Sequence, residues 1–203
     1  MARVTPDVYF SADVETDGSV PGLFSMLSFA FVVAGRFDGV SFVRPERLDM
    51  QTFEAELRPI TNDFDHGALR VNGLDRDRLA REGRHAGEAM TAAAQWIRAC
   101  AGDATPVLVA FPLCFDWAWL YYYFERYAEG GSPFEHSRGY DIKTAYAVKA
   151  GLPISLSGRK SLPQELRSNR LHTHRALDDA LEQAEIFANV FEWKDPAWSE
   201  QKR

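Results

Sequence analysis

Apolar and polar residues alternate along the first part of the chain, as they do in β-strands. Residues 8–15 place apolar side chains on one face of a strand, while the opposite face ends in Asp13 and Glu15. Residues 25–33 and 39–44 predict two further strands, with a glycine-containing loop between them. Because no helical pattern separates these strands, we expect them to pair in an antiparallel arrangement.

Helical spacing replaces this alternation in the second half of the chain. Residues 87–101 are rich in alanine, contain no proline and are followed by Gly102, so they predict a helix. Residues 106–111 predict a short buried strand, and residues 115–127 predict an apolar, aromatic helix. Strands followed by helix, strand and helix predict an α/β protein with a mixed sheet of about five strands flanked by helices.

The C-terminal region is predicted to be helical as well. Residues 141–150 and 162–167 predict short helices separated by a loop. The last helix is marked by an apolar stripe at steps of three and four residues, formed by Leu177, Ala180, Leu181, Ala184, Phe187, Ala188 and Phe191. We expect one domain over residues 1–192 and a polar C-terminal tail over residues 193–203.

Composition and charge fit an ordinary globular domain of 203 residues, of which 46% are hydrophobic. The most apolar stretch, residues 107–124, is interrupted by Pro112 and Asp116, so we expect no membrane span. Only two cysteines, Cys100 and Cys114, are present, which indicates reduced thiols and a cytoplasmic location. The net charge of −6 argues against a protein that coats nucleic acid with a basic surface, but it is compatible with a carboxylate-rich metal site.

Asp13 and Glu15 are the first candidates for chemistry. They lie two residues apart on a predicted strand, so both side chains project from the same face and can share a metal ion. The strand is otherwise apolar, and two ionised carboxylates are costly to bury without partners. The alternative is a strand at the edge of the sheet, with both carboxylates in water.

Asp116, His174 and Asp179 are the other candidates. Asp116 lies in the first turn of a predicted helix, directly after a strand, where open α/β sheets build sites but where an aspartate is also favoured by the helix dipole. Positions five apart on a helix point about 140° apart. His174 and Asp179 therefore meet only if His174 lies in the loop before the last helix; a surface loop histidine is the alternative.

Asp178 competes with Asp179 for a place in the site. On a helix, Asp178 aligns with Glu182 and Glu185, which we expect to form an acidic face in water. Asp179 aligns with Gln183, nearer the buried side, and this register favours Asp179.

Taken together, three segments of the chain resemble the DEDDh exonuclease superfamily, which includes proofreading subunits of DNA polymerases, RNase T and oligoribonuclease. The segments are ADVETDG at residues 12–18, FDWAWL at residues 115–120 and HRALDDA at residues 174–180. Weaker matches are VNGLDRDRL at residues 71–79 and YDIKTAY at residues 140–146. The resemblance implies a ribonuclease H-like fold and a 3′–5′ exonuclease that releases nucleoside monophosphates from the 3′ end of single-stranded DNA or RNA.

The resemblance also implies a site for two Mg²⁺ or Mn²⁺ ions. Asp13 would contact both ions, Glu15 and Asp179 would bind the ion that holds the attacking water, and Asp116 would support the other. His174 would accept the proton of the water. A histidine suits this role because the ordinary pKa of its side chain lies near neutrality.

Substrate contacts are less clearly indicated. Phe24, Met26 and Leu27 follow the first segment and can stack against a terminal base, or they can belong to the core of the second strand. Arg159 and Lys160 can hold a phosphate or lie in a solvated loop.

Two departures from the superfamily concern substrate binding. Asn72 stands where a histidine is common in relatives. Residues 111–114 read Phe-Pro-Leu-Cys, where many relatives carry an asparagine-containing segment that contacts substrate. Pro112 has no N–H, and no side-chain amide is present there.

Two other functions stay open. One is a non-catalytic nucleic-acid-binding or polymerase-accessory protein with the same fold. The other is a metal-dependent phosphoesterase that acts on a small nucleotide.

Overall fold

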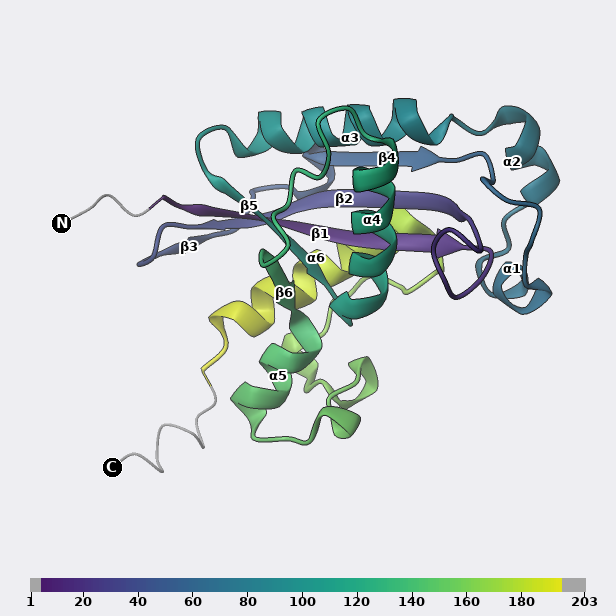
Figure 1. The fold of residues 1–203 in the computed structure, drawn as a ribbon. Helices are drawn as coiled ribbons and strands as arrows, with labels where there is room; N and C mark the ends of the chain where they lie inside the picture. Colours follow the sequence, from purple (N-terminus) through teal and green to yellow (C-terminus); the bar gives the residue numbers. More distant parts are fainter. Residues whose placement is uncertain (1–4, 195–203) are drawn as a thin grey trace, which may run out of the picture.

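The computed structural model describes residues 5–194, and its centre is a mixed sheet. The strands follow the order β3-β2-β1-β5-β6, and β4 also pairs with β2 (Figure 1). Their bounds are β1 Asp7–Thr16, β2 Met26–Phe37, β3 Phe42–Val43, β4 Thr52–Glu56, β5 Thr105–Ala110 and β6 Gly139–Asp141. The helices are α1 His66–Asn72, α2 Arg76–Glu82, α3 Ala86–Ala101, α4 Leu113–Tyr127, α5 Ile142–Ala150 and α6 Ala176–Glu192. The predicted α/β class with a mixed, helix-flanked sheet is confirmed.

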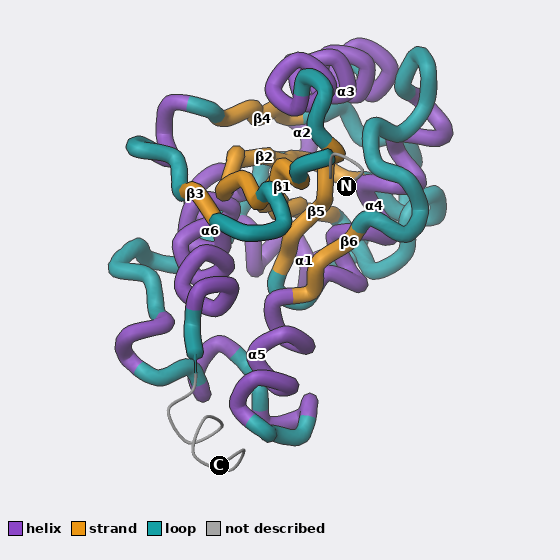
Figure 2. The backbone as a smooth tube through the Cα atoms, turned by 90° about the vertical axis from the view of Figure 1, so that its left-hand side faces the viewer, coloured by secondary structure: helices purple, strands orange, loops and turns teal. Residues whose placement is uncertain are grey.

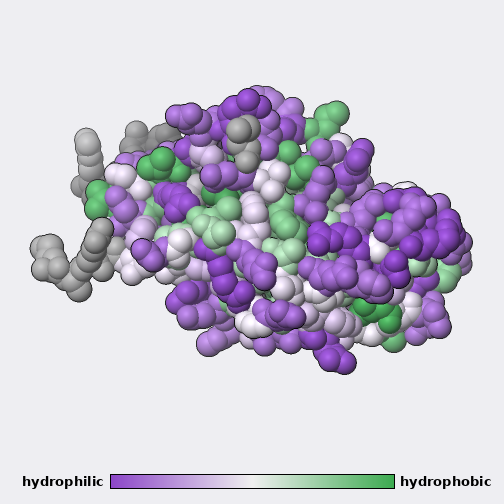
Figure 3. Space-filling view, turned by 90° about the horizontal axis from the view of Figure 1, so that it is seen from above, coloured by the Kyte–Doolittle hydropathy of each residue, from purple (hydrophilic) through white to green (hydrophobic). Residues whose placement is uncertain are grey.

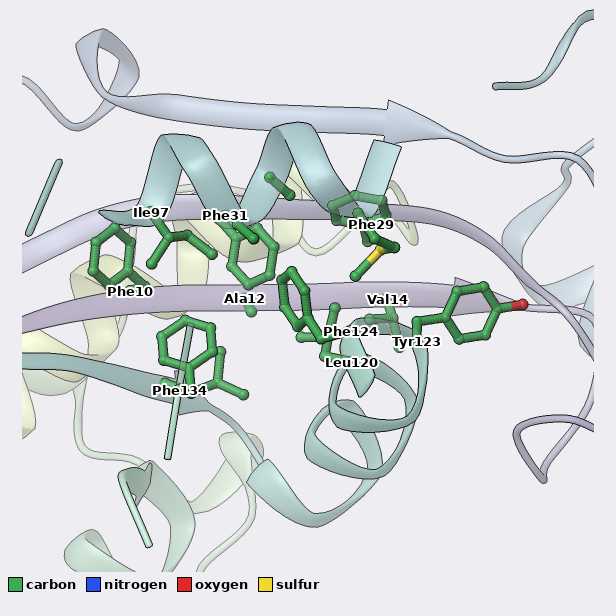
Figure 4. Close-up of a cluster of buried hydrophobic side chains, with 14 of the residues drawn as sticks. Phe10, Ala12, Val14, Phe29, Phe31, Ile97, Leu120, Tyr123, Phe124 and Phe134 are labelled. Atoms are coloured by element: carbon green, nitrogen blue, oxygen red, sulfur yellow. The ribbon is translucent and has the colours of Figure 1, made fainter. Parts of the chain in front are cut away.

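The sheet separates two hydrophobic cores, because β1 alternates as predicted. Its apolar face packs against α3 and α4, and Figure 4 shows Phe10, Ala12 and Val14 on that side together with Phe31 of β2 and Phe124 of α4. The opposite face packs against α5 and α6. Figure 2 shows α3 on one side of the strands, with α6 and α5 on the other.

β1 lies in the interior of the sheet. It pairs antiparallel with β2, as predicted, and parallel with β5 from Asp7–Thr105 to Ser11–Val109. Beyond Ser11 the parallel ladder with β5 ends, while pairing with β2 continues to Thr16. The carboxyl end of β1 is therefore open on one side, and the helices α1 and α4 lie near it (Figure 1).

Several elements differ from the sequence prediction. The predicted strand at residues 39–44 is reduced to Phe42–Val43, because β2 runs on to Phe37 and the Asp38 carboxylate accepts the turn N–H groups of Val40 and Ser41. The predicted helix at residues 162–167 is only a 3₁₀ turn, Gln164–Leu166, which starts after a proline. The strands β4 and β6 and the helices α1 and α2 were not predicted as elements; each is seven residues or shorter.

The surface of the molecule is mostly polar. Hydrophilic residues cover most of the face seen from above in Figure 3, and hydrophobic residues form smaller patches between them. No helix within the described part of the chain is long and apolar enough to cross a membrane. The predicted tail begins with Trp193, whose ring centroid lies 6.1 Å from that of Tyr146; residues 195–203 of the tail lie outside the described residues.

Candidate active site

A cavity of about 690 Å³ opens at the carboxyl end of β1. It is bounded by β1, by the start of α4 and by the loop that precedes α6. All five candidate catalytic residues line it, namely Asp13, Glu15, Asp116, His174 and Asp179. The structure thus brings together residues from opposite ends of the chain, such as Asp13 and Asp179.

Asp13 and Glu15 project from the same face of β1, as the strand alternation predicts. One ligand oxygen each from Asp13, Glu15 and Asp179 lies within 4.8 Å of the others. Because β1 pairs with both β2 and β5 over its first half, and because neither carboxylate is exposed, the alternative of an edge strand with both carboxylates in water is wrong. Glu15 is buried and Asp13 is half-buried.

Asp116 occupies the gap left where β5 separates from β1. It lies in the first turn of α4, is buried, and its Oδ1 accepts the backbone N–H of Val14 at 3.1 Å. That N–H lies beyond the part of β1 that pairs with β5, so Asp116 takes the place of a missing strand partner. The hydrogen bond fixes the carboxylate beside Asp13 and Glu15.

Asp179 organises the loop that carries His174. α6 begins at Ala176, so His174 precedes the helix and Asp179 lies in its first turn, as predicted. The Asp179 carboxylate accepts the backbone N–H of Thr173 at 2.8 Å and that of His174 at 3.0 Å. Asp179 is fully buried, whereas Asp178 is partly exposed and accepts the Thr173 hydroxyl at 3.0 Å.

The expected acidic face of Asp178, Glu182 and Glu185 is not fully solvated. Glu182 is buried and pairs with Arg159, with Nη1 and Oε2 2.9 Å apart. Glu185 pairs with Arg170 at 2.7 Å. The helical register was right, but loops before α6 supply arginines that cover this side of the helix.

Gln183 is a site residue that the sequence reasoning did not single out. Its side chain is buried, its Nε2 donates to Oδ1 of Asp13 at 2.8 Å, and its Oε1 accepts the N–H of Phe111 at 2.6 Å. Gln183 therefore joins α6, β1 and the end of β5. The one available signal was its position four residues after Asp179, on the same side of the helix.

Asp17 belongs to the same segment as Asp13 and Glu15 but has a different role. Its side chain is fully buried, accepts the N–H of Ser25, and pairs with Arg76 of α2 at 2.8 Å. The Arg76 guanidinium also donates to the carbonyl of Thr61. The ion pair of Asp17 and Arg76 therefore connects the loop after β1 to α2.

Burial and mutual repulsion perturb the carboxylates of the site. Burial, followed by the charges of Asp116, Glu15 and Asp179, raises the pKa of Asp13 well above its usual range. Burial, followed by the charges of Asp179 and Asp116, raises the pKa of Glu15 to about 8. Burial raises the pKa of Asp116 to about 7. Clustered oxygen ligands that resist ionisation without a counter-charge fit a divalent cation.

The substrate candidates divide into two groups. Asn72 and Arg159 line the cavity; Asn72 donates to the carbonyl of Thr16 at 2.9 Å, and the Arg159 guanidinium lies 5.6 Å from the ring centroid of Phe111. Lys160 is exposed and does not line the cavity, as the solvated-loop alternative expects.

The proposed stacking residues are corrected by the structure. Met26 and Leu27 are fully buried, so their predicted contact with a terminal base is wrong and the core alternative holds. Phe24 is half-buried and lies against Gly18, where a Cβ would come within 2.1 Å of its ring. The residues after the first segment turn inward because strand β2 begins there.

Fold and site together define a nuclease with a ribonuclease H-like fold and an acidic cluster that can hold divalent metal. No family model matches the chain. The chain is 33% identical over 186 residues to the 3′–5′ DNA exonuclease Cap18 of Escherichia coli, covering 91% of this chain and 92% of that protein. The chain therefore belongs to the DEDD family of 3′–5′ exonucleases and is a hydrolase that acts on nucleic acid.

Solved structures agree with this fold. A full-length 3′-exonuclease superposes with a TM-score of 0.64 at 12% identity, over 94% of this chain and 62% of that one. Cell-death related nuclease 4 gives a TM-score of 0.63 at 12% identity, over 93% and 64% of the two chains. Exonuclease I of E. coli, in complex with a dT13 oligonucleotide, gives 0.59 at 16% identity, over 97% and 43%. This chain thus spans less than two thirds of each of these structures.

Proposed function

We propose that this protein removes nucleoside monophosphates stepwise from the 3′ end of single-stranded DNA, with two Mg²⁺ or Mn²⁺ ions at the site. The convergence of Asp13, Glu15, Asp116 and Asp179 on one cavity carries the proposal. The relative Cap18 is named a DNA exonuclease, which is the reason for choosing DNA over RNA. The proposed catalytic domain is residues 1–192, and the free thiols of Cys100 and Cys114 support the cytoplasm as its location.

The side chains of the site divide the work of hydrolysis. Asp13 would contact both ions, Glu15 and Asp179 one of them, and Asp116 the other. When bound, the ions would activate the attacking water and stabilise the leaving 3′ oxygen in an in-line displacement. His174 accepts the proton of that water from its place at the exposed wall of the cavity, where solvent can carry the proton away.

Apolar side chains at the cavity mouth can contact the terminal nucleotide. Phe115 and Val71 line the cavity and are 41% and 58% exposed, so they offer apolar surface that is not used by the core. We assign base stacking to Phe115, in place of Met26 and Leu27, because a base and an aromatic ring stack without regard to sequence. Arg159, which lines the same cavity, offers a positive charge to a phosphate.

A non-catalytic accessory protein is the less favoured function. Such a protein needs the fold but not the convergence of four carboxylates and a histidine, and here all five line one cavity. A phosphoesterase specific for small nucleotides shares the chemistry and differs in substrate length.

Product analysis tests the proposal. DNA and RNA oligomers of the same sequence, labelled at the 5′ end, are incubated with Mg²⁺, with Mn²⁺ or with EDTA. We expect a ladder of stepwise shorter DNA products with either ion and intact DNA with EDTA. Faster shortening of RNA would refute the choice of DNA, cleavage of a circular single strand would refute the exonuclease assignment, and activity on dinucleotides alone would indicate the phosphoesterase.

A further inference from the structure

A second group of metal-ligand atoms lies beside the acidic cluster. One ligand atom each from His172, His174 and Asp179 lies within 4.8 Å of the others. The two imidazole rings have centroids 4.6 Å apart and planes at 70°, and both line the cavity. Both histidines are exposed, whereas Asp179 is fully buried behind them. His172 takes no part in the proposed hydrolysis.

The backbone holds the two rings in this arrangement. His174 has a φ of 56°, in the left-handed region that residues other than glycine rarely adopt. The N–H groups of Thr173 and His174 both donate to Asp179, so the carboxylate that completes the group also fixes the turn between the two histidines. The loop backbone therefore places the two histidines on the same side, next to Asp179.

The surroundings of His172 match those of a ligating histidine. Its Nδ1 lies 3.2 Å from Oε2 of Glu182 and 3.0 Å from Oδ2 of Asp179. Histidines that bind a metal through one ring nitrogen commonly donate the other N–H to a carboxylate, which orients the ring. Glu182 is placed for that role, because it is buried and its charge is already balanced by Arg159.

Arg159 limits the affinity of this group for a cation. Its Nη1 also lies 2.5 Å from Nδ1 of His172 and can donate there only when Nδ1 carries no proton. A cation bound through Nε2, with the Nδ1 proton donated to Glu182, therefore has to displace this contact of the guanidinium. Three protein ligands with an open fourth position are typical of catalytic zinc sites and not of closed structural ones. We therefore expect reversible occupancy.

The ligand atoms of this second group favour a different cation from the one that the acidic cluster favours. Two imidazoles and one carboxylate suit Zn²⁺, whereas Mg²⁺ prefers oxygen ligands. We propose that His172, His174 and Asp179 form a Zn²⁺ site that overlaps the catalytic site through Asp179 and His174. Zn²⁺ bound there withdraws Asp179 from the acidic cluster and occupies the nitrogen of His174, so it inhibits the enzyme. The inhibition rests on the proposed function; the binding of Zn²⁺ does not.

Calorimetry tests the site directly. Zn²⁺ is titrated into the protein in the presence of excess Mg²⁺, for the wild type, His172→Gln and the control His136→Gln, in which an exposed histidine outside the cavity is changed. We expect the wild type and His136→Gln to bind Zn²⁺ alike, and His172→Gln to bind at least about tenfold more weakly. No Zn²⁺ binding by the wild type, or equal binding by His172→Gln, would overturn the proposal.

Inhibition supplies the second readout. The Mg²⁺-supported rate on a 5′-labelled DNA oligomer is measured against Zn²⁺ and normalised to the zinc-free rate of each variant. We expect half-inhibition of His172→Gln to need about ten times more Zn²⁺ than that of the wild type or His136→Gln. Equal inhibition of all three would mean that Zn²⁺ acts at the acidic cluster alone. If no variant degrades DNA, the proposed function fails while calorimetry still decides the Zn²⁺ site.

Discussion

The metal-free protein should lose stability as the pH rises. Burial and neighbouring charges raise the pKa of Glu15 to about 8, from an ordinary value of 4.5. Between these two values the folded protein keeps a proton on Glu15 that the unfolded chain has released. The folded state therefore binds more protons, and the free energy of unfolding falls with increasing pH throughout that range.

The size of the effect follows from the same pKa values. Each unit of difference between the folded and unfolded pKa corresponds to about 1.4 kcal/mol, so the shift of Glu15 from 4.5 to about 8 amounts to about 5 kcal/mol as an upper limit. For a domain of this size, about 1 kcal/mol changes Tm by about 2–4 °C. We expect Glu15 to lower Tm by up to roughly 10–20 °C between pH 4.5 and about 8 when EDTA is present.

Thermal unfolding followed by circular dichroism measures this effect, in EDTA and in excess Mn²⁺. Mn²⁺ should remove most of the fall, because the cation neutralises the carboxylates. The matched variant Glu15→Gln should be more stable than the wild type at the upper end of the range in EDTA and should gain less from Mn²⁺. A flat profile for the metal-free wild type, or an equally steep one for Glu15→Gln, would refute the account of repulsion within the site.

Four further predictions concern single side chains. Asp13→Asn should abolish turnover while the folded protein remains, which kinetics and circular dichroism check together; a near-normal rate would exclude the two-metal site. His174→Ala should lose about 10²–10⁴ in rate, with the acid limb of the wild-type pH–rate profile absent; an unchanged profile removes it from the mechanism. Asp179→Asn should weaken Mn²⁺ activation, whereas Asp178→Asn should stay close to the wild type, and the reverse result in a Mn²⁺ titration would mean a register error in α6. Gln183→Leu should lower the free energy of unfolding by about 1–3 kcal/mol in urea titrations, because it leaves the buried N–H of Phe111 without an acceptor; no change would show that Gln183 does not hold the end of β5.

The local pattern of apolar and polar residues was sufficient to predict strand β1 and helix α6. The alternation of β1 is visible in eight residues and predicts both which face is apolar and which face carries Asp13 and Glu15. The apolar stripe of α6 sets a helical register that separates Asp179 from Asp178 and places His174 before the helix. Both predictions depend only on residues close together in the chain.

The features that were missed depend on partners far away in the chain. Gln183 is important because it meets Asp13 and Phe111, which are 170 and 72 positions away. Glu182 was assigned to water because no local pattern shows that Arg159 will cover it. Met26 was one of the candidates for base stacking because its position after the first segment was visible, while its burial depends on the helices α3 and α4, which belong to the same core.

The buried pair of Asp17 and Arg76 affects how a mutational scan of this protein should be interpreted. Asp17 lies two residues after Glu15 and carries a carboxyl group too, yet its side chain is fully buried and its partner is an arginine of α2. Removal of one member of a buried ion pair typically costs about 3–5 kcal/mol. A screen that scores only DNA degradation would therefore count Asp17 among the catalytic acids, although its loss acts through the amount of folded enzyme. Abundance scored beside activity distinguishes the two kinds of aspartate in this short segment.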